Sequence, residues 1–116
     1  MIFGYLLKKS PSIFAGWQNR YFILQNNKLK YFLSSSTDAG PRGVICFDKV
    51  HTTVEEVNKD EFKFDITIKG LTRVFNLKAP DKKAYDMWIK ELNAVILKSK
   101  GYKESISFTQ LHENIN

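Results

Sequence analysis

Two cations and a tyrosine in the first third of the chain have the types and spacing of a phosphate site. Lys8, Arg20 and Tyr31 each lie two residues from an apolar side chain, so strand alternation places all three on an apolar face, near one end. Two inward cations without a carboxylate nearby in the sequence cannot be buried unpaired. Phosphate fits them, because Lys supplies a point charge, Arg a bidentate fork and Tyr a hydroxyl donor. The alternative is that these groups face solvent or pair with Asp or Glu of a distant strand.

A second feature is the segment of residues 9–17, which carries the adjacent apolar residues Ile13 and Phe14. A loop between two strands seldom displays two large apolar groups without a use. Cations around an apolar tip are typical of a surface that docks on an anionic membrane. We therefore predict that Ile13 and Phe14 enter lipid. The alternative is that one of them folds back onto the end of the barrel.

Charge is distributed unevenly along the chain. The 116 residues carry a formal net charge of +6, and residues 1–43 hold six basic residues against the single acidic Asp38. The excess in the first third indicates one anionic partner that meets one end of the fold. The length predicts one domain, and a hydrophobic fraction of 43% is enough for a folded core.

Other classes of protein are disfavoured. The longest nearly apolar stretch, residues 2–7, is far short of a membrane span, and we expect no signal peptide. The single cysteine, Cys46, indicates a reducing cytosolic setting. His51 and His112 have no metal-ligand spacing with it, so we expect neither metal nor cofactor. No base is spaced to activate a nucleophile, which argues against an enzyme.

Seven segments have the alternation or the aromatic and β-branched content of strands: residues 4–8, 19–24, 29–33, 44–47, 52–57, 61–68 and 71–77. Their connections are too short for crossovers, which predicts antiparallel pairing. Asn26-Asn27 tolerates positive φ and suits a tight hairpin. The pattern predicts a mainly β fold, a seven-stranded antiparallel bent sandwich or barrel.

One helix is expected to cap this sheet. Beyond Pro80, apolar residues recur at helical spacing: Ala84, Trp88, Leu92, Val95 and Ile96. Asp81 or Ala79 would be the N-cap, and Gly101 is the expected end. Trp88 is the natural plug for one end of the barrel. We expect a domain over residues 1–100 and a polar tail or linker over residues 101–116.

The order and spacing of these motifs resembles a pleckstrin homology (PH) domain over residues 3 to about 100. The matching pieces are Gly4-x-Leu6-x-Lys8, Gly16-Trp17-x-x-Arg20-Tyr21-Phe22-x-Leu24, Leu29-x-Tyr31-Phe32, Arg42-Gly43 and the helix with Trp88. Within that family the chain looks most like the domains of ceramide-transfer and oxysterol-binding proteins and the four-phosphate adaptors. Those domains bind phosphatidylinositol 4-phosphate on Golgi membranes. The resemblance implies a lipid head-group site at Lys8, Arg20, Tyr31 and Arg42, and a 9–17 loop that inserts into the bilayer.

Three positions depart from the pattern of the family. Gln18 stands where binders of three-position inositol lipids usually place a second basic residue, which argues against strong binding of tri-phosphorylated lipids. Leu33 replaces a Lys of the transfer proteins, which weakens phosphate contact. Lys9 replaces a Trp of the inserting loop, so that insertion depends on the charge of Lys9 and on Ile13 and Phe14.

The sequence thus predicts a phosphoinositide-binding, membrane-targeting module, selective for phosphatidylinositol 4-phosphate or another monophosphorylated phosphoinositide. We expect a cytoplasmic monomer, peripheral on membranes such as the Golgi. The alternative is a protein-interaction module with weak or no lipid binding, since related folds bind peptides along the edge between a strand and the terminal helix. Nucleic-acid binding is disfavoured, because the cations gather at a mouth rather than along a groove.

Overall fold

The computed structural model describes residues 1–12, 14–47, 52–68 and 74–110, of which 100–110 by their backbone alone. Seven strands and one helix form the fold: β1 (Ile2–Lys9), β2 (Trp17–Gln25), β3 (Lys28–Phe32), β4 (Gly43–Cys46), β5 (Thr52–Asn58), β6 (Lys63–Ile68), β7 (Val74–Lys78) and α1 (Lys82–Gln110). Two short 3-10 turns, η1 (Thr37–Ala39) and η2 (Lys59–Glu61), interrupt the connections.

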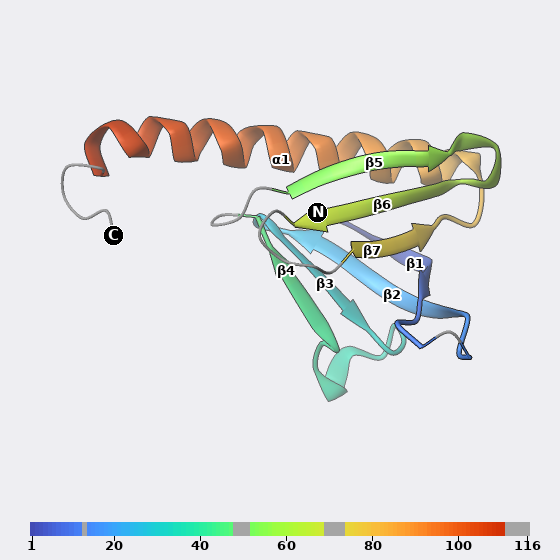
Figure 1. Ribbon diagram of the computed structural model, residues 1–116. Helices are drawn as coiled ribbons and strands as arrows, with labels where there is room; N and C mark the ends of the chain where they lie inside the picture. The colour runs from blue at the N-terminus through green and yellow to red at the C-terminus, as the bar shows by residue number, and fades with distance from the viewer. Residues whose placement is uncertain (13, 48–51, 69–73, 111–116) are drawn as a thin grey trace.

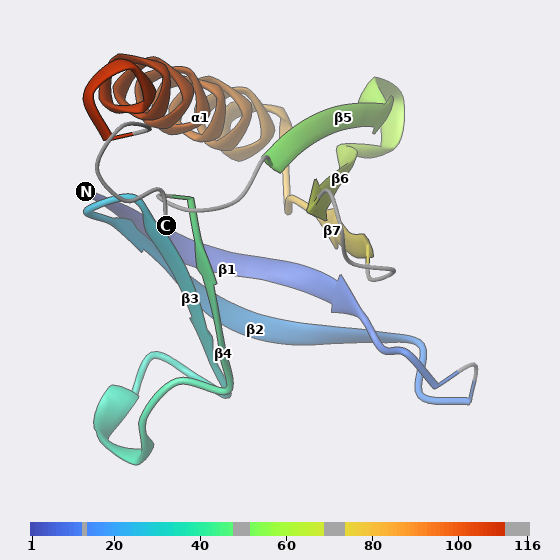
Figure 2. The ribbon, with the colours of Figure 1, turned by 60° about the vertical axis from the view of Figure 1, so that its left-hand side comes forward.

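The strands form one antiparallel sheet in the order β4-β3-β2-β1-β7-β6-β5. The sheet bends so that β1–β4 and β5–β7 make two layers, and α1 lies across one open end, alongside β5 (Figures 1 and 2). Within the described residues β4 and β5 do not pair, so the sheet is bent but not closed. The predicted fold class, a seven-stranded antiparallel sheet with one C-terminal helix, is confirmed.

Trp88 anchors the helix in the core between the two layers. Its indole is buried and meets the Phe22 ring edge-on at a centroid distance of 6.5 Å. Leu92, one helical turn on, is buried in the same cluster as Leu6 and Phe64, from opposite layers. The prediction that Trp88 plugs the end of the barrel is confirmed, and its role is core packing.

Two local signals in the sequence are also confirmed. Asn26 and Asn27 have φ of 52° and 63°, as a two-residue hairpin with a primed turn requires. Asp81 is the N-cap residue of α1, because its Oδ1 accepts a hydrogen bond from the Ala84 backbone N–H at 2.8 Å.

The predicted end of the helix at Gly101 is wrong, because α1 continues through it to Gln110. A single glycine lowers helix propensity by about 1 kcal/mol relative to alanine, and this penalty alone does not end a helix. The strand predicted over residues 61–68 begins two residues later in the structure, at Lys63. The Asn58 side chain accepts hydrogen bonds from the backbone N–H groups of Asp60 and Glu61, which forms η2, and Phe62 then takes a left-handed φ of 59°.

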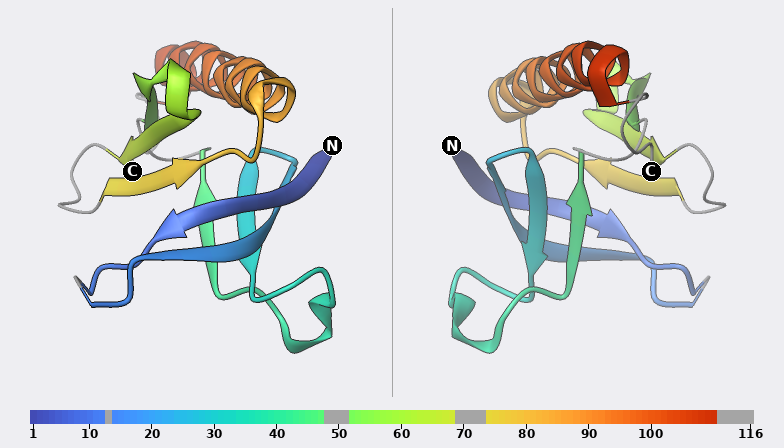
Figure 3. Two further views of the ribbon diagram at one scale, coloured as in Figure 1. Left: turned by 90° about the vertical axis from the view of Figure 1, so that its right-hand side faces the viewer. Right: turned by 90° about the vertical axis from the view of Figure 1, so that its left-hand side faces the viewer.

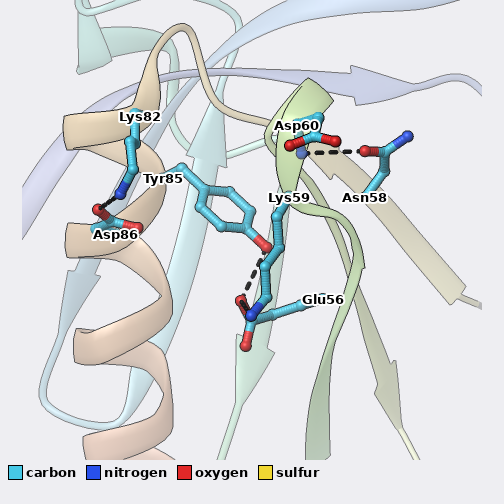
Figure 4. A network of polar contacts seen from close by, with 7 residues as sticks. All are labelled: Glu56, Asn58, Lys59, Asp60, Lys82, Tyr85 and Asp86. Carbon is cyan, nitrogen blue, oxygen red and sulfur yellow. Dashed lines mark hydrogen bonds and ion pairs between the residues drawn. The ribbon is translucent and has the colours of Figure 1, made fainter.

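A polar contact between α1 and β5 holds the helix over the sheet (Figure 4). The buried Tyr85 donates a hydrogen bond to Oε1 of Glu56 at 3.1 Å, and Lys59 lies 3.9 Å from the same oxygen. Burial and the neighbouring Glu56 carboxylate raise the pKa of Tyr85 to about 12. The phenol therefore remains a hydrogen-bond donor throughout the neutral pH range.

At the opposite side of the sheet, Gly43 leaves space for the ring of Tyr31. The two residues are opposite each other in the β3–β4 pair, and Tyr31 lies directly over the Gly43 Cα. A Cβ at position 43 would overlap the Cε1, Cζ and hydroxyl oxygen of Tyr31. By contrast, a Cβ at Gly4 of β1 would meet no atom within 4 Å.

These glycines give a matched pair of variants. Gly43→Ala should lower the free energy of unfolding by about 1–3 kcal/mol, because the ring of Tyr31 or the strand β4 must move. Gly4→Ala should leave it unchanged or raise it by up to about 1 kcal/mol, since alanine restricts the unfolded chain. Urea denaturation measures both. Equal stability of the two variants would contradict the packing described for Tyr31.

Candidate functional site

Lys8 and Tyr31 meet at the open end of the sheet near the β1–β2 loop. Both side chains point to the inner side, as predicted, and Lys8 is only 6% exposed. The Lys8 Nζ lies 5.2 Å from the centroid of the Tyr31 ring, within the range of a cation–π contact. The Tyr31 ring also packs against the ring of Phe22, its partner on β2, at a centroid distance of 5.4 Å. The Lys8 side chain is thus buried, with its ammonium over an aromatic ring.

Arg20 lies one strand away on β2, opposite Leu6, and is half-buried. Its guanidinium donates to the Asn19 carbonyl at 2.8 Å and to the Gln18 Oε1 at 3.1 Å. In the part of the chain that the structure describes, Arg20 forms no ion pair with a carboxylate. Pairing with a distant Asp or Glu, the alternative left open by the sequence, is therefore not observed for Arg20, and further N–H donors remain for an anion.

Arg42 is joined to the same end through the backbone. Its N–H donates to the Tyr31 carbonyl at 2.7 Å, and the Arg42 residue is exposed. No ion pair of Arg42 is found among the described residues. The structure therefore brings Lys8 and Tyr31 into contact and places Arg42 next to Tyr31 along β3–β4. Arg20 lies on β2, and its guanidinium is hydrogen-bonded to Gln18 and Asn19 of the same strand.

A hollow of about 220 Å³ adjoins Lys8 on the side away from Arg20. It lies where β1 and β7 part, since these strands pair only at Leu7 with Lys78 and at Lys8 with Leu77. Its lining is Lys8, Lys9, Ser10, Pro11, Val74, Phe75 and Asn76. The residues from β7 were missed by sequence reasoning, because no local signal indicates which distant strand pairs with β1.

The β1–β2 loop projects beyond this end, at the lower right of Figure 2. The Ser10 N–H donates to the Gly16 carbonyl at 2.8 Å, and Gly16 has a φ of 65° that favours glycine. Phe14, at the loop tip, is 92% exposed, and Lys9 is exposed at the loop base. Phe14 therefore does not fold back onto the barrel, and of the alternative that one of the two residues does so, only the Ile13 form stays open. Ile13 lies outside the described residues.

Trp17 and Lys63 make a further contact at the base of this loop. The Lys63 Nζ lies 5.8 Å from the centroid of the Trp17 ring, within the range of a cation–π contact. This contact joins the start of β2 to the start of β6. The same ammonium lies 2.9 Å from Glu61 and lowers the pKa of that carboxyl by hydrogen bonding and by its charge. Sequence reasoning missed this contact, which crosses two layers of the fold.

Among the described residues, no helix has both the length and the apolar character needed to cross a bilayer.

Comparison by sequence finds relatives of two kinds, ceramide transfer proteins and an Arf-GAP. The chain is 38% identical over 85 residues to the ceramide transfer protein of Xenopus tropicalis and 36% identical to that of Homo sapiens, which covers 72% of this chain in both cases. It is 31% identical over 104 residues, 87% of the chain, to the rat Arf-GAP with coiled-coil, ANK repeat and PH domain-containing protein 2. The chain spans 13% of the length of these ceramide transfer proteins and 12% of the length of the Arf-GAP.

Solved structures share the fold. The PH domain of human oxysterol binding protein-related protein 11 superposes with a TM-score of 0.71 at 24% identity, covering 90% of this chain and 84% of its own. The C-terminal PH domain of pleckstrin, in complex with the inositol pentakisphosphate D-myo-Ins(1,2,3,5,6)P5, gives 0.69 at 26% identity, covering 83% and 94%. The family model of the PH domain matches residues 1–97. On this match and these relatives, the chain belongs to the PH domain family.

Proposed function

We propose that this PH domain is a non-catalytic module that binds a phosphoinositide and recruits the protein containing it to a membrane. The observation that carries the proposal is the Lys8 ammonium, held over Tyr31 at an open end of the sheet. A phosphate there would gain a charge-assisted hydrogen bond from Lys8. Arg20 and Arg42, which have no carboxylate partners in the described residues, would supply further donors.

We further propose a monophosphorylated lipid, with phosphatidylinositol 4-phosphate as the first candidate and the cytoplasmic face of the Golgi as the membrane. Gln18 is neutral and already accepts from Arg20, so it offers a second phosphate no charge. The similarity to ceramide transfer proteins and the earlier resemblance to Golgi-directed domains support this choice. The pleckstrin complex with an inositol pentakisphosphate supports inositol phosphates as the ligand class.

The loop tip supplies the second part of the proposed membrane contact. Phe14 exposes nearly all of its surface in the loop beyond Lys8 and Tyr31. Lys9, a cation at the base of the same loop, is also exposed. An aromatic side chain that enters the interface adds apolar burial, and the nearby cation adds attraction to anionic lipid. Lipid is therefore bound through a head group at the mouth and through the loop.

The first test removes the cations of the mouth. Lys8→Met retains the length of the side chain without its charge, and Arg20→Ala removes the guanidinium. Each should weaken binding to vesicles containing phosphatidylinositol 4-phosphate by about 1.5–3 kcal/mol, as expected for a hydrogen bond to a charged group. Lys98→Ala, at an exposed position of α1, is the control and should bind as the wild type does. A folded Arg20→Ala protein with unchanged vesicle binding would contradict the site.

A second test measures selectivity. Vesicles with mono-, bis- and tris-phosphorylated phosphoinositides are titrated at equal total lipid charge, so that general attraction to an anionic surface is the same in each. The monophosphorylated lipid should bind most tightly, because Gln18 cannot hold a second phosphate by charge. A clear preference for the tris-phosphorylated lipid would overturn this assignment.

The third test separates the loop from the mouth. Phe14→Ser should weaken vesicle binding by up to about 1.5–3 kcal/mol, less if the ring reaches only the interface. Binding of the soluble head group, inositol 1,4-bisphosphate, should not change. Val57→Ser, an exposed apolar residue of β5, is the control. Equal losses for vesicles and head group would show that the loop shapes the pocket instead of entering lipid.

A further inference from the structure

The outward side of the β1–β4 layer carries apolar side chains that neither the core nor the proposed lipid site uses. Phe3 and Val44 are 55% and 50% exposed, Tyr5 is 38% exposed, and Tyr21 and Ile23 are half-buried. We call these five residues the outer aromatic face.

The register shows that the outer aromatic face extends over β1 and β2 and reaches Val44 of β4 across Lys30 of β3. Phe3 of β1 is opposite Ile23 of β2, which is opposite Lys30 of β3, which is opposite Val44 of β4. Tyr5 and Tyr21 form the neighbouring row. Directly opposed residues point to the same side of a sheet, so these side chains lie together.

The aromatic rings of this face pack against one another. Tyr5 and Tyr21 meet edge to face at 5.1 Å, and Phe3 lies tilted 6.2 Å from Tyr21. The Tyr5 hydroxyl accepts a hydrogen bond from the Ser35 N–H at 2.9 Å, which fixes that ring further. A surface whose side chains are already held in place loses little conformational freedom when a partner binds.

The outward side of the second layer, β5–β7, has a different composition. There the outward Asp65 and Asn76 hydrogen-bond to each other at 2.8 Å, and Lys63 is opposite Lys78. That face is mostly polar, as is usual for the water-facing side of an antiparallel sheet, although Val74 on it is 43% exposed. A cluster of exposed aromatic and aliphatic side chains on the other layer, with Lys30 between Ile23 and Val44, is the pattern of an interaction surface.

Charge specifies the chemistry of the occupant. Lys30 lies among the residues of the outer aromatic face. Lys28, two residues earlier on β3, is on the same side of the sheet. In residues 1–47 the single acidic residue is Asp38, which lies in η1 and not on these strands. A second copy of the chain would bring the same cations together, with a net charge of +6 on each copy. The complement is a segment with apolar anchors and carboxylates.

From this patch and its charge we propose that the outer aromatic face docks an acidic amphipathic helix of a partner protein. A helix is the element that packs on the face of a sheet, whereas an extended peptide would pair with an edge strand. Its apolar side would cover Phe3, Tyr5 and Val44, and a carboxylate would reach Lys30. Phe3 lies six residues from Lys9 along β1, or about 20 Å at the rise of a strand, so this surface is separate from the loop tip.

The test uses two synthetic amphipathic helices of about five turns with identical leucine positions, one with glutamates on its flanks and one with lysines. Amide shifts of the isotope-labelled domain report where each binds. The acidic peptide should shift Phe3, Tyr5 and Ile23 and bind about tenfold or more tightly than the basic one. Equal affinity of the two peptides, shifts confined to other surfaces, or no shifts at all would overturn the proposal.

Variants then locate the contact. Phe3→Ser combined with Val44→Thr should weaken the acidic peptide about tenfold or more, and Leu97→Ser, an exposed apolar residue of α1, should not. Lys30→Glu should reverse the preference between the two peptides. Binding of the double variant to phosphatidylinositol 4-phosphate vesicles should stay at the wild-type level. A loss of vesicle binding there would make this face a membrane contact and overturn the assignment to a protein. Should the double variant not fold, Lys30→Glu and the amide shifts of the wild type still decide the question.

Discussion

The buried cation of Lys8 is the constraint on which the structure of the end near the β1–β2 loop depends. Lys8 is only 6% exposed, and its ammonium lies 5.2 Å from the centroid of the Tyr31 ring, which is one of the contacts that stabilise the buried charge. That ring is held there because Tyr31 is packed between Phe22 on its own layer and the backbone at Gly43. The position of one charge thus follows from the packing of a tyrosine, which in turn follows from the absence of a side chain on the neighbouring strand.

The same end of the fold joins three segments that are distant in sequence. β1 supplies Lys8, the start of β7 lines the hollow beside it, and the residue before β4 binds the Tyr31 carbonyl. The helix α1 lies across the other open end, as Figure 3 shows from two sides. Its Trp88 is buried in the core. The proposed ligand site is therefore at the end opposite the helix, near the β1–β2 loop. The outer aromatic face is a third surface, on the reverse side of the layer that carries Lys8.

Much of this arrangement could be predicted from strand alternation. The inward direction of Lys8 and Tyr31 followed from their spacing to Leu6 and Leu29, and the hairpin at Asn26 followed from turn chemistry. The partners of the site could not be predicted in this way. Pairing of β1 with β7 joins residues about seventy positions apart, and such long-range contacts leave no periodic signal within either segment.

Two errors have specific physical causes. The expected end of α1 treated Gly101 as a stop, although a glycine ends a helix only when the backbone there turns left-handed. The strand predicted over residues 61–68 extended its alternation back through Phe62, which the Asn58-capped turn removes from the sheet. The roles of Lys8, Arg20, Tyr31 and Arg42 in lipid binding, and those of Lys9, Ile13 and Phe14 in insertion, remain predictions.

The central claim is that a phosphate binds where Lys8 meets Tyr31. The most direct measurement is a crystal structure of the domain with inositol 1,4-bisphosphate. The account predicts a phosphate within hydrogen-bond distance of the Lys8 Nζ, with the Arg20 guanidinium rotated away from Gln18 toward the ligand. A head group bound on another surface, with Lys8 and Arg20 left in their present contacts, would contradict it.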